Sequence, residues 1–159
     1  MKTPVNYVKS LQRHELTPEM IGACAYSCNK RAKNARDKQA YYRNRRWMRC
    51  YDKFENEDHY REKKEYYYEL KDKMIHLFEP ECIHYVKESG EYFLLYRIGE
   101  YTFHNPIYKG EIETKYKHLK LYTLEKLVTS GRNINDLVSC QFIKKVIDLI
   151  DSGDYTIVK

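Results

Sequence analysis

The chain lacks any long apolar segment. Among its 159 residues, no apolar run approaches the roughly 18 residues that span a membrane, and residues 1–16 contain no apolar region typical of a signal peptide. The sequence therefore predicts a cytoplasmic protein that does not contact a membrane.

Cysteine and glycine are present, but not in the patterns that define a disulfide framework or a nucleotide loop. The five cysteines are an odd number without framework spacing, so we expect reduced thiols. None of the six glycines forms a phosphate-binding or dinucleotide-binding loop. No nucleophile is spaced to partner a general base. The sequence therefore predicts a protein that is not an enzyme and binds no cofactor.

Acidic residues are almost absent from one segment, which makes it the most basic part of the chain. Residues 30–49 contain nine basic residues and one acidic residue, a net charge of +8, while the remaining 20 basic and 22 acidic residues sum to −2. We expect an anionic partner, such as the phosphates of RNA or DNA, to bind at this segment. The predicted partner-binding residues are Lys30, Arg31, Lys38, Arg43, Arg45, Arg46 and Arg49, with Tyr42 and Trp47 as apolar anchors.

Two features of this segment have a second interpretation. Its positive charge is also compatible with a solvated helix that is balanced by the acidic residues around 55–58 and by glutamates of the next helix. The 17 tyrosines of the chain fit either a binding surface, where tyrosine is enriched, or a bias in composition.

Residues 17–78 have the periodicity of two long helices. Thr17 is a suitable cap before Pro18, and small residues then recur at helical spacing up to Ala35. The second helix, from Asn56 as its cap to about residue 78, carries large residues at the same spacing. Since small residues allow close approach of a second helix, the sequence predicts an antiparallel helical hairpin that turns near residues 50–55.

After Pro80 the pattern changes to short strands with glycine-bearing turns. We expect strands at 82–87, 92–98 and 101–104, with a break at Asn105–Pro106. A further short strand at 117–122, a short helix at 123–128 and a strand at 155–158 are also expected. The last helix has a wide apolar face, with Asn133 or Asn135 as its N-terminal cap and Gly153 as its C-terminal cap. Residues 1–15 are expected to be extended, or to form a short strand at 5–8.

These elements predict an α+β fold in a single domain, residues 1–159. In this prediction, residues 17–78 form a basic helical hairpin, and residues 79–159 form a small antiparallel β-meander packed on a C-terminal helix.

Two weaker patterns suggest other chemistry. Soft ligands at a helix–strand junction suit zinc, but a Cys-x-x-x-Cys spacing in a helix equally suits close packing. The four candidate ligands are Cys24, Cys28, Cys82 and His84. Glu113 and Lys115, with Glu100 upstream, are similar to the acidic-x-Lys arrangement of metal-dependent nucleases, which requires carboxylates on adjacent strands.

Four stretches together resemble small accessory proteins of phages and mobile elements of low-GC Gram-positive bacteria. They are IGACAYSCNKRAKNARDK (21–38), ECIHY (81–85), YFLLYRIGEYTFHNPI (92–107) and NDLVSCQFIKKVIDLI (135–150). The resemblance implies a short, single-domain, non-catalytic effector that acts by stoichiometric binding, a class that includes inhibitors of CRISPR effectors. Many such inhibitors are acidic mimics of nucleic acid, whereas this chain is basic in its most prominent segment.

The expected function is therefore inhibition of a host defence nucleoprotein in the bacterial cytoplasm, with a CRISPR effector of the Cas9 class as the first candidate partner. The alternative is a stand-alone nucleic-acid-binding regulator of phage genes. A hairpin with tyrosines on its faces is also compatible with a dimer, so the sequence leaves the oligomeric state open.

Overall fold

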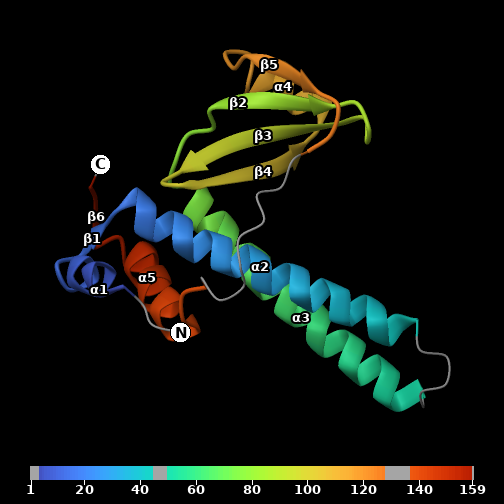
Figure 1. The fold of residues 1–159 in the computed structure, drawn as a ribbon, viewed down its shortest axis with the longest axis horizontal. Coiled ribbons are helices and arrows are strands. Elements are labelled where there is room, and N and C mark those ends of the chain that lie inside the picture. The colour runs from blue at the N-terminus through green and yellow to red at the C-terminus, as the bar shows by residue number, and fades with distance from the viewer. Residues whose placement is uncertain (1–3, 45–49, 128–136, 159) are drawn as a thin grey trace.

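The predicted helical hairpin, sheet and last helix are all present in a computed structural model of the chain. The structure describes residues 4–44, 50–127 and 137–158, with the backbone alone described for residues 50–55. The α+β fold class is confirmed (Figure 1). Its elements in chain order are α1 (Val5–Gln12), β1 (Glu15–Leu16), α2 (Pro18–Arg43), α3 (Cys50–Ile75), β2 (Cys82–Val86), β3 (Glu91–Ile98), β4 (Tyr101–Ile107), α4 (Lys109–Thr114), β5 (Leu121–Leu124), α5 (Cys140–Ser152) and β6 (Thr156–Ile157).

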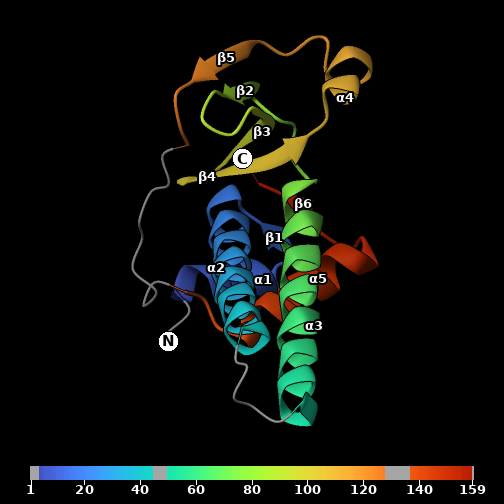
Figure 2. The ribbon, with the colours of Figure 1, turned by 90° about the vertical axis from the view of Figure 1, so that its right-hand side faces the viewer.

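Helices α2 and α3 form the predicted hairpin and lie side by side in Figures 1 and 2. The Thr17 side chain caps α2 by accepting a hydrogen bond from the backbone N–H of Met20 at 3.2 Å. The buried residues of α2 in the hairpin include Cys28, Ala32 and Ala35, all of them small. Helix α3 supplies larger buried side chains, namely Tyr67, Leu70 and Met74, so the expected pairing of small with large residues is confirmed.

The sheet has the strand order β4-β3-β2-β5 and packs on α2 through β3 and β4. Strands β2, β3 and β4 form the predicted antiparallel meander, and β5 pairs with β2 in parallel. The buried side chains of Ile83, Leu94 and Phe103 join the same hydrophobic core as the two helices. The sheet therefore covers one side of the hairpin near the start of α2, and the other ends of α2 and α3 project beyond it (Figure 1).

Helix α5 packs on α3, on the side of the hairpin away from the sheet (Figure 1). The sequence prediction placed the meander on this helix, whereas the structure places both on the hairpin. Two side chains of α2 hold the chain just before α5. The backbone N–H of Val138 donates to the Ser27 hydroxyl at 3.0 Å, and the Arg31 guanidinium donates to the Val138 carbonyl at 2.8 Å.

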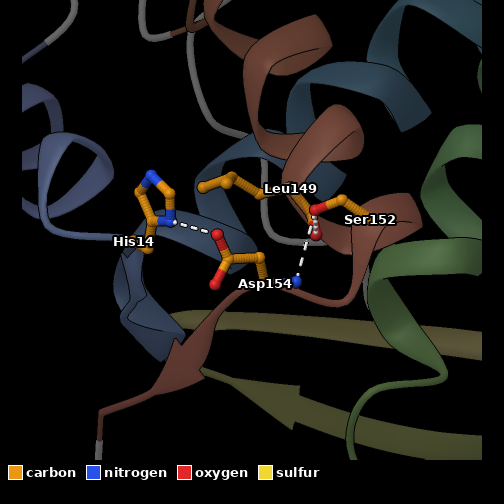
Figure 3. Close-up of polar contacts among 4 residues, drawn as sticks. All are labelled: His14, Leu149, Ser152 and Asp154. Atoms are coloured by element: carbon orange, nitrogen blue, oxygen red, sulfur yellow. Dashed lines mark hydrogen bonds and ion pairs between the residues drawn. The ribbon is translucent and has the colours of Figure 1, made fainter.

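The last residues return to the start of the chain, where β6 pairs with β1 in parallel. Figure 3 shows the contacts at this closure: His14 Nδ1 lies 3.0 Å from an Asp154 carboxylate oxygen. The Ser152 hydroxyl donates to the Leu149 carbonyl at 2.9 Å and accepts from the Asp154 N–H at 3.2 Å (Figure 3). The predicted glycine cap of α5 is confirmed, because Gly153 has a φ of 75° in the left-handed region.

Several predicted boundaries at helix starts are wrong. Residues 5–8 belong to α1 rather than to a strand, and the ring of Tyr7 stacks on Phe142 of α5 at 6.2 Å. Helix α3 begins at Cys50, so Asn56 lies within it and does not cap it. The cap of α5 is Ser139, which accepts from the Phe142 N–H at 3.2 Å. Asn133 and Asn135 lie outside the described residues.

Two predictions about the sheet are also wrong. Pro106 does not end the third strand, because β4 continues to Ile107. Strand β4 lies at the edge of the sheet, where a residue without an N–H is tolerated. Residues 123 and 124 form part of β5 rather than a helix, because they pair with Tyr85 and Val86 of β2. Within the described ranges, no helix is long and apolar enough to cross a membrane.

Gly22 provides a sharp test of the packing between α2 and the sheet. A Cβ at this position would collide with the Ile98 carbonyl oxygen and lie 3.0 Å from the Tyr101 ring. We expect Gly22→Ala to lower the free energy of unfolding by about 1–3 kcal/mol, the usual cost of overpacking. Urea unfolding followed by circular dichroism measures this change.

Gly110→Ala in α4 is the matched control, because a Cβ there meets no atom within 4 Å. Alanine favours helix over glycine by up to about 1 kcal/mol, so this variant should be as stable as the parent or slightly more stable. Equal losses in both variants would contradict the close approach at Gly22.

Candidate anion-binding cleft

A cleft of about 940 Å³ separates the helical hairpin from the β4 edge of the sheet. One wall consists of side chains from α2 and α3, and the other consists of side chains from β3, β4 and α4. Because these elements lie far apart in the chain, the cleft exists only in the folded protein. Its volume lies within the range of about 300–1,000 Å³ that is usual for ligand sites.

The helical wall carries four basic side chains. Lys30, Lys33 and Arg36 follow one another on α2 at intervals of three residues, which keeps them on neighbouring turns of one face. Lys71 of α3 lines the same cleft. The acidic residues that line it are Asp72 and Glu111. The cleft therefore has an excess of positive charge.

The charges in this cluster disfavour one another. Burial lowers the pKa of the Lys33 ammonium, and the nearby charges of Lys30 and Arg36 lower this pKa further. Burial also lowers the pKa of Lys71; the Asp72 carboxylate opposes this shift and Lys33 adds to it. Both lysines thus sit where a positive charge is less stable than in water. An anion in the cleft would relieve this cost.

Two of these lysines lie close to aromatic rings. The Lys30 ammonium lies 5.6 Å from the Tyr26 ring centroid, and the Lys71 ammonium lies 5.0 Å from that of Tyr68. Among the described residues, no ion pair involves Lys30, Lys33 or Lys71. Their charge therefore remains available to a partner.

The sheet wall is aromatic and polar. The Tyr26 and Tyr101 rings pack at 5.0 Å across the junction of α2 and β4. Burial raises the pKa of Tyr96 to about 12, and its neighbour Tyr116 contributes to the shift. Asn105 also lines the cleft and offers an amide group for hydrogen bonds. This wall suits a planar ring with polar edges.

Two histidines adjoin the cleft at the sheet edge. His104 lines it, and the His84 ring lies 5.4 Å from the His104 ring. Burial lowers the pKa of both, and His84 lowers that of His104 further. Within the described part of the chain, the buried His84 Nδ1 has no hydrogen-bond partner. Burial therefore favours the neutral form of both rings.

The residues predicted from the sequence do not all meet at this cleft. Lys30 lines it. Arg31 donates to the Val138 carbonyl instead, and the Lys38 ammonium lies 5.4 Å from the Tyr60 ring centroid. Arg43 forms an ion pair with Glu57 at 2.9 Å, which agrees at this one residue with the interpretation of an internally balanced helix.

Tyr42 is the other predicted residue that the structure describes. The Tyr42 ring stacks on Tyr60 of α3 at 5.7 Å, so part of this predicted anchor is used within the hairpin. Arg45, Arg46, Trp47 and Arg49 lie outside the described residues.

Sequence reasoning missed three of the four cleft cations. Lys33 and Arg36 belong to the basic segment but are not among the predicted partner-binding residues, and neither is Lys71. Their spacing contains a signal, since positions 30, 33 and 36 follow Tyr26 on one side of the helix. The contribution of Lys71 has no such signal, because it depends on how α3 packs against α2.

The alternative chemistries have little geometric support. Cys24 and Cys28 lie buried in α2, and burial raises the pKa of Cys28 to about 12, whereas Cys82 and His84 lie on β2. Across residues 4–44, 50–127 and 137–158, no three His, Cys, Asp or Glu side chains are placed to hold a metal ion. Glu113 lies in the short helix α4, not on a strand as the nuclease arrangement requires.

Comparison of the chain with known protein families, curated proteins and solved structures found no match. The cleft and its charges are therefore the features of this chain that bear on its function.

Lys33→Met tests whether the cation cluster costs stability. The substitution keeps the aliphatic stem and removes one of three neighbouring charges on α2. Like-charge pairs at helical spacing cost about 0.2–0.5 kcal/mol each, so we expect the melting temperature to rise by about 1–2 °C. Lys144→Met on the exposed face of α5 should give no rise. A loss of stability in Lys33→Met would show that the ammonium has a structural partner.

The two histidines predict a pH dependence of stability. Their pKa values are lowered in the folded protein, so the unfolded chain binds more protons as the pH falls below about 6.5. The free energy of unfolding should therefore decrease between pH 7 and pH 5. Urea unfolding at several pH values should show a smaller decrease in the double variant His84→Gln/His104→Gln. Parallel profiles for the parent and the variant would contradict the assignment.

Proposed function

We propose that this protein is a non-catalytic accessory protein that binds a nucleoprotein in the bacterial cytoplasm and contacts its nucleic-acid phosphates. The observation that carries this proposal is the cluster of four basic side chains in the cleft, three of which have no ion pair among the described residues. Burial, with a further contribution from neighbouring positive charges, lowers the pKa of Lys33 and of Lys71, and a phosphate partner would offset this cost.

The shape of the molecule also supports a partner of this kind. The hairpin projects beyond the sheet (Figure 1), and its basic helix α2 carries the cleft residues Lys30, Lys33 and Arg36 and runs on to Arg43. Lys38 and Arg43 lie on this last part of α2 and are exposed. A nucleic-acid strand that enters the cleft would therefore meet further basic residues along the same helix.

The resemblance to phage accessory proteins favours one class of target. A CRISPR effector of the Cas9 class carries guide RNA, and this RNA presents phosphates next to protein surfaces. Binding to such a complex would inhibit the effector by occupying the surface along which the phosphates of the guide RNA lie.

The alternative is a regulator that binds RNA or DNA alone. The accessible cations favour this regulator to the same extent as they favour binding to a nucleoprotein, because free nucleic acid has the same phosphates.

The test is to measure the affinity of the full-length protein for three partners: the effector with guide RNA, the effector alone, and the free RNA or duplex DNA. We expect the tightest binding to the complex. The logarithm of the affinity should fall with the logarithm of the salt concentration, with a slope of about −0.7 to −0.9 per phosphate neutralised.

Matched charge variants identify the surface that binds the nucleic-acid phosphates. Lys30→Gln/Arg36→Gln removes two cleft cations and should weaken binding at least tenfold while reducing the salt slope by about two units. Lys144→Gln/Lys145→Gln removes two exposed cations of α5 and should bind as the parent does. Tight binding to free nucleic acid alone would favour the regulator. Equal effects of the two double variants would contradict a role for the cleft, and no binding to any of the three partners would contradict both proposals.

A further inference from the structure

The two walls of the cleft differ in chemistry, and binding to a phosphate backbone does not require this difference. The cations lie on the helical wall, on α2 and α3, while strands β3 and β4 and the residue Tyr116 contribute aromatic and amide groups, and α4 contributes the carboxylate of Glu111. A surface that only follows a phosphate backbone needs positive charge but no enclosed aromatic wall. A site with both matches a ligand that has an anionic end and a planar end.

The anionic end of such a ligand would meet Lys33, Lys71 and Arg36. These side chains come from two helices and converge on one cleft, so a phosphoryl group can reach more than one of them. Arg36 lies 3.7 Å from Asp37, its neighbour on the exposed surface, through Nε. Its two Nη groups remain suited to forked contacts with phosphate oxygens.

The planar end would meet Tyr101, Tyr116 and Asn105. The two rings are half-buried, so each keeps accessible surface, whereas Tyr26 and Tyr96, which also line the cleft, are buried. An aromatic ring accepts any base on its face, and the Asn105 amide can both donate to and accept from a base edge. This combination distinguishes a nucleotide from inorganic phosphate and from an acidic peptide.

We infer that the cleft is a binding site for a single phosphorylated nucleotide, with the phosphate at Lys33, Lys71 and Arg36 and the base on the wall that carries Tyr101 and Tyr116. The ligand is either a free nucleotide or the 5′-phosphorylated end of a single strand. This inference deepens the proposed function, on which it rests for nucleic acid as the partner. It adds that the protein binds a defined unit of the nucleic acid, namely one phosphorylated nucleotide.

Calorimetric titration of the full-length protein tests the inference. The probes are adenosine and uridine 5′-monophosphates, adenosine without phosphate, inorganic phosphate, and a pentanucleotide with and without a 5′-phosphate. We expect a monophosphate to bind at least tenfold more tightly than either adenosine or inorganic phosphate. Tighter binding of the phosphorylated pentanucleotide than of the monophosphates identifies a strand end as the ligand, and the reverse order identifies a free nucleotide.

Three variants locate the site. Lys71→Met keeps the aliphatic stem and should weaken binding of a monophosphate at least tenfold, whereas Lys63→Met, exposed on the same helix, should not change it. Tyr116→Leu should weaken binding of the monophosphate but leave the weak binding of inorganic phosphate unchanged. The melting temperature of each variant confirms that it is folded.

The outcomes separate this inference from the proposed function. If the nucleoprotein binds but no monophosphate or phosphorylated pentanucleotide does, the nucleotide site is overturned and the proposed function stands. If the nucleotides bind and the nucleoprotein does not, the site stands and the proposed function fails. Equal binding of inorganic phosphate and monophosphates would also overturn the inference, because the aromatic wall would then contribute nothing.

Discussion

Close packing around α2 is the constraint on which the rest of this structure depends. At the start of the helix, Gly22 brings its backbone against the Ile98 carbonyl at the end of β3. Further along, Cys28, Ala32 and Ala35 leave room for the larger side chains of α3. On a third side, Ser27 and Arg31 hold the chain that leads into α5. One helix thus positions the sheet, the second helix and the last helix.

This arrangement also produces the cleft. The sheet covers only the first part of α2 (Figure 1), and the turns of α2 that carry Lys30, Lys33 and Arg36 line the cleft opposite β4. The cations of these turns are held beside Lys71, where burial and mutual repulsion make their charged forms less stable. Proteins commonly keep such costs where a ligand compensates for them. The same packing that stabilises the fold therefore concentrates positive charge at one place.

The differences between the predicted and the observed elements have a common physical cause. Residues 121–124 were expected to lie partly in a strand and partly in a helix, and parallel pairing with β2 decides that they form a strand. Pro106 was expected to end its strand, and the edge position of β4 removes the need for its N–H. The short helix α1 packs Tyr7 against Phe142 of α5. In each case a distant partner outweighs the local preference.

The sequence by itself determined the helical hairpin, the meander, the Thr17 and Gly153 caps and the location of the excess positive charge. These properties depend on neighbours within one or two turns, which periodicity and composition record. Only the tertiary structure decided which cations act together. Arg31 and Arg43 are held by Val138 and Glu57, whereas Lys33 and Arg36 meet Lys71 from another helix. The charge along a helix follows directly from the sequence. Which partners surround each charged side chain depends on distant residues that only folding brings near.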